Sequence, residues 1–264
     1  SGSAGDPTQW QRWLKRNRLA HRQPGYAAIL IPLKAPGRAP GDVTSSEMDA
    51  IAEIADRFSQ GFIRVSHTQD FVLPAVREAD LPDLYEALKG LNLHHAVGGL
   101  IGAMVACPGG DFCALANARS LPIADDIAQR FAALDAQENI GPLDLRISGC
   151  MNSCGHHHTG HIGILGVDKD GAAFYQILLG GHSGHGAPAA LGTIIGRAFA
   201  EDEVADAVEE IIDAYLEQRE AGETFRHTVA RLGKPVFAHA AEAARKPDHK
   251  PKRTQTEDRS EAQV

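Results

Sequence analysis

The sequence predicts an α+β fold in two domains, the first with an antiparallel sheet covered by helices on one face and the second with mixed α and β elements. Three observations carry this prediction: the order β-α-β-β-α over residues 21–96, a change to glycine-rich loops after Val97, and four cysteines that all lie in the second domain. The chain has 264 residues, 43% of them hydrophobic, which is enough to bury a core.

Apolar periodicity and capping signals define the elements of the first domain. Residues 26–33 form a strand-like apolar run, and residues 62–66 and 71–73 predict two further strands. Between them, Thr44 and Glu47 form a capping-box pattern before apolar residues that recur at helical spacing. A second helix begins after Asp80 and ends at Gly90. This order is most of a ferredoxin-like split β-α-β unit.

The second domain, residues 97–245, alternates short strands with helices. Strands are expected at 143–148, 162–167 and 172–179, and the last two are joined by a segment ending in Asp170-Gly171, a strong hairpin signal. Helices are expected around residues 122–136 and 202–220, the second marked by apolar residues at helical spacing.

Both ends of the chain have the composition of unpacked segments. We interpret residues 1–20 as an N-terminal linker or the edge of a longer chain, because the sequence opens with Ser-Gly-Ser-Ala-Gly. Residues 246–264 mix both charges with proline and have almost no apolar side chains, so a disordered tail is expected.

Charge and hydropathy exclude several classes of partner. The formal charge of -8 argues against nucleic acid, which requires an excess of basic residues. No run reaches the roughly 18 consecutive apolar residues of a membrane-spanning helix, and no secretory signal is evident at the start. A cytoplasmic protein without a membrane partner is expected.

The four cysteines form two closely spaced pairs. Five residues separate Cys107 from Cys113, and three separate Cys150 from Cys154. Four thiolates suit zinc or an iron–sulfur cluster, and the five-residue gap favours the wider cluster, because structural zinc sites have cysteines two to four residues apart. Glycine in both loops lets the backbone wrap closely around an inorganic core. Zinc binding, or a purely structural role for buried cysteines, remains the alternative.

Histidines follow the second cysteine pair. His156, His157, His158 and His161 could bind zinc or haem, but neighbouring side chains of an extended segment point to opposite faces, so one or two are expected to be donors in a pocket and the rest structural or solvated. His182 and His185 lie in a glycine-rich loop and are expected to be solvated.

At these loops the sequence resembles the sirohaem-dependent sulfite and nitrite reductase family, whose signature is Cys-x5-Cys followed by Cys-x3-Cys. The resemblance covers about residues 20 to 240 and includes residues 148–158, 162–166, 115–119 and the hairpin at 64–70. Family members are internal duplications, and the resemblance places this chain on the C-terminal half, which implies a companion N-terminal half. Two positions depart from the family pattern: Asp70 stands where Asn is common, which implies a negative charge near an anionic macrocycle, and Met151 stands where Pro is common.

The resemblance also implies cofactors and residue roles. Cys107, Cys113, Cys150 and Cys154 would ligate a 4Fe-4S cluster, and Cys154 would bridge it to the iron of sirohaem as the catalytic residue. The carboxylates of sirohaem need cations and donors, and the candidates are Arg64, Arg119, Arg146 and Asn152.

The implied activity is the six-electron reduction of sulfite to sulfide or of nitrite to ammonia, with ferredoxin or a flavoprotein reductase as electron donor. Sulfite is the favoured substrate. Alternatives are an electron-transfer or interaction module that holds the cluster alone, and the branch of the same family that acts as a monooxygenase on a precorrin.

Overall fold

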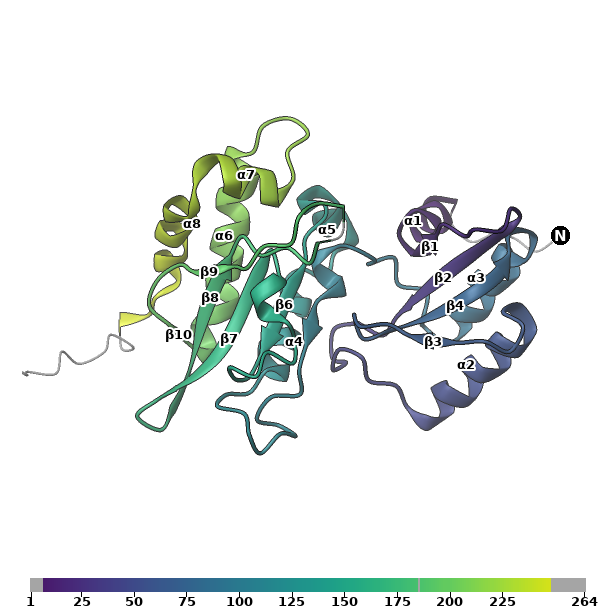
Figure 1. Cartoon of the computed structure of the whole chain (residues 1–264), viewed down its shortest axis with the longest axis horizontal. Helices are drawn as coiled ribbons and strands as arrows, with labels where there is room; N and C mark the ends of the chain where they lie inside the picture. The colour runs from purple at the N-terminus through teal and green to yellow at the C-terminus, as the bar shows by residue number, and fades with distance from the viewer. Residues whose placement is uncertain (1–6, 185, 248–264) are drawn as a thin grey trace, which may run out of the picture.

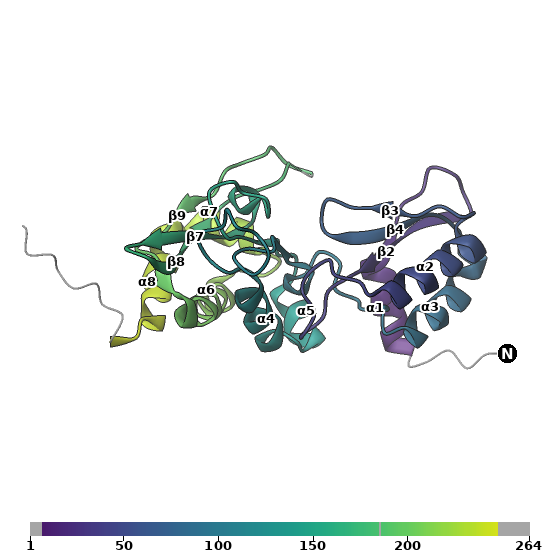
Figure 2. The same ribbon diagram turned by 90° about the horizontal axis from the view of Figure 1, so that it is seen from below.

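The computed structural model describes residues 7–184 and 186–247, which form two lobes lying side by side (Figure 1). In each lobe a sheet lies against helices packed below it in the view of Figure 2. Each lobe has its own cluster of buried apolar side chains, one built from residues 13–96 and the other from residues 101–244. The chain therefore folds as two domains with separate cores.

The first lobe has a four-stranded antiparallel sheet with the strand order β1-β2-β4-β3. Its elements are α1 (Pro7–Asn17), β1 (Arg18–Leu19), β2 (Tyr26–Pro32), α2 (Ser45–Phe58), β3 (Arg64–Val65), β4 (Asp70–Arg77) and α3 (Leu81–Gly90). Figure 2 shows α1, α2 and α3 on the same side of this sheet. The order of β2, α2, β3, β4 and α3 is the predicted ferredoxin-like order.

Local sequence explains the start of α2. The Thr44 side chain accepts from the Glu47 amide at 3.2 Å, and the Glu47 carboxylate accepts from the Thr44 amide at 2.8 Å, so the predicted capping box is formed. Ile51, Ile54 and Phe58 are buried against the sheet as the helical spacing requires.

The second lobe has a six-stranded mixed sheet in the order β10-β8-β7-β6-β5, with β9 paired to β8. Its strands are β5 (Val105–Ala106), β6 (Leu145–Ser148), β7 (Ile162–Lys169), β8 (Ala172–Leu179), β9 (Thr193–Ile194) and β10 (Phe199–Ala200). The pairs β5 with β6 and β6 with β7 are parallel, and β7 with β8 forms the predicted hairpin. Strand β5 is the edge strand beyond β6, and Figure 1 shows β6 on the side of the sheet that faces the first lobe.

Five α-helices of the described chain contribute buried residues to the core of the second lobe. They are α4 (Leu121–Arg130), α5 (Leu134–Ile140), α6 (Val204–Gln218), α7 (Phe225–Leu232) and α8 (Lys234–Ala241). The longest, α6, lies centrally and buries Val204, Val208, Ile211 and Tyr215. None of the helices in the described part of the chain is long and apolar enough to cross a bilayer.

Several expectations need correction. Residues 7–19 are not a linker: they form α1 and β1, because Trp13 is completely buried and stacks on Trp10 with ring centroids 5.4 Å apart. The single helix expected at 122–136 is two helices, and the Gln137 side chain donates to the Phe131 carbonyl at 2.7 Å where the first one ends.

Helices α7 and α8 were not predicted from the sequence. Lys246 is exposed but hydrogen-bonded to the second lobe rather than part of a tail, since its amide donates to Glu203 at 2.8 Å. The rest of the expected tail, residues 248–264, lies outside the described residues, as do residues 1–6 and His185.

Candidate iron–sulfur site

The four cysteines lie on two loops that leave neighbouring parallel strands. Cys107 follows β5 directly, and Cys150 comes two residues after the end of β6. Because parallel strands end at the same edge of a sheet, both loops start side by side. The amide of Cys107 still donates to the Ile147 carbonyl at 3.1 Å, which holds the first cysteine in register with the second loop.

Backbone contacts between the two loops are close. The Gly149 amide donates to the Cys107 sulfur at 3.1 Å, and the Gly149 carbonyl accepts from the amides of Asn117 and Ala118 at 2.9 and 3.0 Å. A Cβ atom on Gly149 would lie 2.5 Å from the Ala118 carbonyl oxygen and 2.9 Å from the Cα of Gly109. Only glycine therefore lets the two cysteine loops meet at this point.

The second loop turns sharply back toward the sheet. Ser153 and His156 have left-handed backbone conformations, with φ of 59° and 55°. Between them, Gly155 donates to the Ser148 hydroxyl at 3.1 Å, and a Cβ there would lie 2.0 Å from the Ile147 carbonyl oxygen. This turn brings Cys154 back beside the end of β6.

The thiols differ in exposure. Cys107 and Cys150 are buried, Cys113 is half-buried and Cys154 is exposed, and none forms a disulfide. Three large apolar side chains on the same loops are also exposed: Phe112 (80%), Leu115 (74%) and Met151 (79%). A soft four-thiol donor set, with the Gly149 backbone amide directed at the Cys107 sulfur, fits an iron–sulfur cluster. No group of three or more His, Cys, Asp or Glu side chains in the described residues is arranged to hold a single metal ion.

The first lobe reaches the cysteine loops through the turn between β3 and β4. The Gln69 side chain donates to the Ala106 carbonyl at 2.7 Å and accepts from the Ala106 amide at 3.0 Å. Ala106 precedes Cys107 on the edge strand, so these groups face away from β6 and Gln69 pairs with them as a further strand would. Gln69 was not predicted as a residue of the site, because its contact joins positions that are 37 apart in the sequence.

A buried ion pair supports the same turn. Lys34 and Asp70, with side chains 2% and 3% exposed, approach to 2.6 Å. The Lys34 ammonium also donates to the carbonyls of Thr68 and Gln69, at 2.6 and 3.2 Å, which uses its three protons. Burial lowers the pKa of Lys34, and the Asp70 charge opposes that shift. The negative charge expected at Asp70 is therefore compensated within this chain.

The candidate donors for sirohaem lie in different environments. Arg64 is exposed on β3 and Asn152 is exposed on the second cysteine loop. Arg119 lies beyond the first cysteine loop, and its side chain donates to Asp111 at 2.7 and 2.8 Å. Arg146 is 4% exposed on β6 and its Nε donates to both oxygens of Asp144 at 2.9 Å. The structure gathers Arg119 and Asn152 near the cysteines and buries Arg146.

The histidines after Cys154 have distinct surroundings. His157 is fully buried, and burial, with the neighbouring His158 charge, lowers its pKa to about 4. Its Nδ1 lies 3.2 Å from the Ser153 hydroxyl, within the second cysteine loop. His156 is exposed, and His161 is half-buried at the start of β7.

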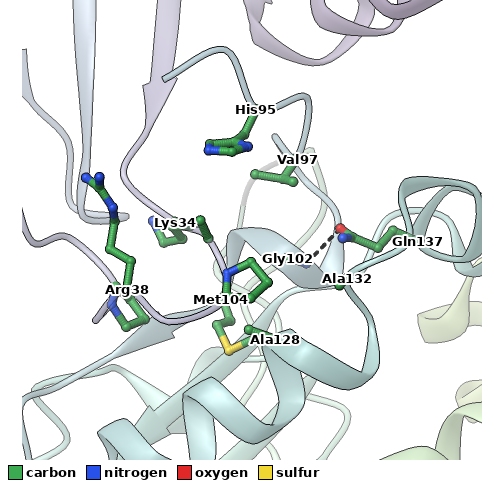
Figure 3. Close-up of a pocket in the computed structure, with 12 residues that line it drawn as sticks. Lys34, Arg38, His95, Val97, Gly102, Met104, Ala128, Ala132 and Gln137 are labelled. Atoms are coloured by element: carbon green, nitrogen blue, oxygen red, sulfur yellow. Dashed lines mark hydrogen bonds between the residues drawn. The ribbon is translucent and has the colours of Figure 1, made fainter. Parts of the chain in front are cut away.

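A small pocket of about 80 Å³ lies where the two lobes meet. Figure 3 shows its lining, in which Lys34, Arg38 and His95 come from the first lobe and the Gln137 side chain accepts from the Gly102 amide at 3.1 Å. None of the four cysteines lines this pocket, so we regard it as part of the junction between the lobes.

Two glycine-bearing loops with four cysteines at the ends of parallel strands, docked on a ferredoxin-like unit, define the class of iron–sulfur protein with a cluster domain and a half-domain beside it. The chain belongs to the family described as the nitrite and sulphite reductase 4Fe-4S domain, which residues 98–247 match. Residues 21–91 match the nitrite/sulfite reductase ferredoxin-like half domain.

Named relatives include both kinds of reductase. The chain is 28% identical to a ferredoxin sulfite reductase of Mycobacterium tuberculosis over 223 residues, covering 78% of this chain and 39% of that protein. It is 30% identical to a ferredoxin–nitrite reductase of Synechococcus elongatus over 181 residues, covering 66% of this chain and 34% of that protein. The chain thus spans little more than a third of the length of these relatives.

Solved structures have the same fold. The Mycobacterium tuberculosis NirA protein superimposes with a TM-score of 0.68 at 24% identity, covering 84% of this chain and 41% of that one. Dissimilatory sulfite reductase I superimposes with a TM-score of 0.67 at 15% identity, covering 90% of this chain and 73% of that one. At these identities the likeness establishes the fold.

Proposed function

We propose that this chain is the cluster-holding half of a sulfite reductase, with nitrite as the alternative substrate. The observation that carries the proposal is the gradient of exposure at the cysteines, from buried Cys107 and Cys150 to exposed Cys154. A cluster held by all four thiolates would have a sheltered side and one accessible corner, at which a second redox group could share the Cys154 sulfur.

The chain's own residues would prepare the cluster site in two ways. The two loops, locked together through Gly149, fix the positions of the thiolates before iron binds, which lowers the entropic cost of assembly. The hydrogen bond from the Gly149 amide to the Cys107 sulfur would stabilise negative charge on that ligand and tune the reduction potential. When bound, the cluster and sirohaem supply an electron store and the iron centre at which the substrate is reduced.

The exposed polar groups near Cys154 suit the carboxylates of sirohaem. We assign this role to Arg119 and Asn152, and to Arg64 from the first lobe, which forms no ion pair with any residue the structure describes. Arg119 already donates to Asp111, but a guanidinium has five N–H donors, and the remaining N–H groups would bind a sirohaem carboxylate. The exposed Phe112, Leu115 and Met151 would be covered by the macrocycle or by the companion half.

A companion N-terminal half and an electron donor complete the proposal. The chain spans 39% and 34% of the two relatives described above, so we infer that further polypeptide supplies the remaining cations of the substrate site. Both relatives are named for ferredoxin, and we propose ferredoxin or a flavoprotein reductase as donor, in the cytoplasm.

Anaerobic reconstitution tests the proposal. The chain should take up four iron and four sulfide ions, and addition of sirohaem should give a porphyrinoid band whose position changes when the cluster is reduced. Replacing Cys154 with serine should remove that coupling. Met151→Leu, which removes a sulfur of the same loop but keeps an apolar side chain and both cysteines, is the matched control and should leave the spectrum unchanged.

Each failure has a distinct meaning. Stoichiometric zinc without iron or sulfide would refute the cluster. A cluster without a sirohaem band would refute the reductase assignment and favour the electron-transfer module.

A further inference from the structure

A second cavity, of about 450 Å³, lies between the two lobes and contains none of the four cysteines. The turn between β3 and β4 lines one side with His67 and Thr68. The second lobe lines the other side with Arg146, His161 and His182, which come from three segments separated in sequence. The three nitrogen-bearing side chains on this second side have hydrogen-bond donors with no assigned use.

Backbone contacts fix the tautomer of both imidazoles. The amide of Asp144 donates to Nδ1 of His161 at 3.1 Å, and the amide of Gly184 donates to Nδ1 of His182 at 3.1 Å. A nitrogen that accepts a hydrogen bond has no proton, so each neutral ring has its proton on Nε2. Both histidines are thereby held as Nε2–H donors.

The two rings also have a common orientation. Their centroids are 5.8 Å apart and their planes differ by only 9°. His161 is half-buried, and burial lowers its pKa, which keeps the ring neutral. The expectation that His182 is solvated is wrong, since this side chain is half-buried and stacked on His161.

Arg146 adds a permanent positive charge to the same wall. Its Nε is directed at Asp144, but its terminal nitrogens have no partner among residues 7–184 and 186–247. A guanidinium stays charged at any ordinary pH, and its side chain here is 4% exposed. Four N–H groups of a buried cation are therefore left for a ligand or for water.

The carboxylates that line the cavity are already neutralised. Asp144 is paired with Arg146 through both oxygens, and Asp70 is paired with Lys34 at 2.6 Å. These two carboxylates therefore add no uncompensated negative charge to the cavity. The groups of Arg146, His161 and His182 that face it are hydrogen-bond donors. This combination favours a ligand that has negative charge and several acceptor oxygens.

We propose that this cavity binds a small inorganic oxyanion, held by Nε2–H of His161 and His182 and by the terminal nitrogens of Arg146. The volume leaves room for bridging water around such an ion. The site is separate from the cluster, and its test requires neither cluster nor reductase activity.

Sulfate titrated into the full-length chain is the direct test, with calorimetry in a constant chloride background and iron measured in parallel. We expect saturable binding of one sulfate per chain. His161→Asn and His182→Asn keep an acceptor in the place of Nδ1 but lose the Nε2–H donor, and each should weaken binding about tenfold, as the loss of one hydrogen bond to an anion does.

Arg146→Met combined with Asp144→Asn removes the cation without leaving an unpaired carboxylate, and it should abolish measurable binding. His239→Asn, on the exposed face of α8, is the control and should bind as the unsubstituted chain does. Nitrogen-15 spectra of the unsubstituted chain give a second readout, in which sulfate should shift the Nε2 signals of His161 and His182. Binding that does not saturate, equal affinity in all variants, or unshifted imidazole signals would each overturn the proposal. Loss of the cluster with sulfate binding intact would refute the proposed function alone.

Discussion

Replacing Gln69 with methionine should separate the first lobe from the edge of the second sheet. The substitution removes both hydrogen bonds to Ala106, whose residue is 1% exposed, and leaves its amide and carbonyl without partners. An unsatisfied buried backbone group costs about 1–3 kcal/mol, so we expect a loss of about 2–4 kcal/mol in the free energy of unfolding. With a slope of about 3 kcal/mol per molar urea, the midpoint should fall by about 1 M.

A matched control exists in the same lobe. Gln60 also has a left-handed backbone, with φ of 55° against 61° for Gln69, but it is exposed at the end of α2. Gln60→Met therefore repeats the change of side chain on the same kind of backbone without the contact to Ala106. Urea unfolding and exchange of the Ala106 amide measure the difference. If the two variants differ by less than about 0.5 kcal/mol, the proposed pairing with the edge strand is wrong.

Three further substitutions test the site. Lys34→Met leaves Asp70 buried without its cation and should cost about 3–5 kcal/mol in thermal unfolding, whereas Lys34→Met with Asp70→Asn should recover most of that loss. Gly149→Ala puts a methyl group against the backbone of the first cysteine loop and should lower iron retention and destabilise the chain by about 1–3 kcal/mol; Gly90→Ala, which has open space, should change neither. Burial lowers the pKa of His157 to about 4, so below pH 6.5 the folded state binds fewer protons than the unfolded state. The free energy of unfolding should therefore fall by up to about 3 kcal/mol as the pH is lowered from 6.5 to 4. The fall should be smaller in His157→Asn.

Local signals predicted the elements whose causes are local. The capping box at Thr44 gave the start of α2 because both of its hydrogen bonds lie within four residues. The β7–β8 hairpin follows from its Asp-Gly turn. The spacing of the cysteines in two close pairs predicted two loops that bind one cluster together, and in the structure these loops are in contact.

The missed features depend on contacts between distant residues. A strand of two residues such as β5 has no periodicity to detect, and it exists because β6 pairs with one side and Gln69 with the other. Helix α1 falls in the segment that we interpreted as a linker, because the burial of Trp13 depends on the Tyr85 ring of α3, which is distant in sequence. No local sequence pattern around Lys34 or Asp70 predicts an ion pair between these two residues, which are 36 positions apart.

The four cysteine sulfurs differ in solvent exposure, and this difference determines the order in which they react in the metal-free protein. Oxidants and alkylating reagents reach an exposed thiol before a buried one, so damage in air should begin at Cys154 and reach Cys107 last. Under the proposed function, Cys154 is also the sulfur that joins the two redox groups. A preparation handled in air would then lose the connection between the cluster and sirohaem while the other three cysteine ligands are still intact.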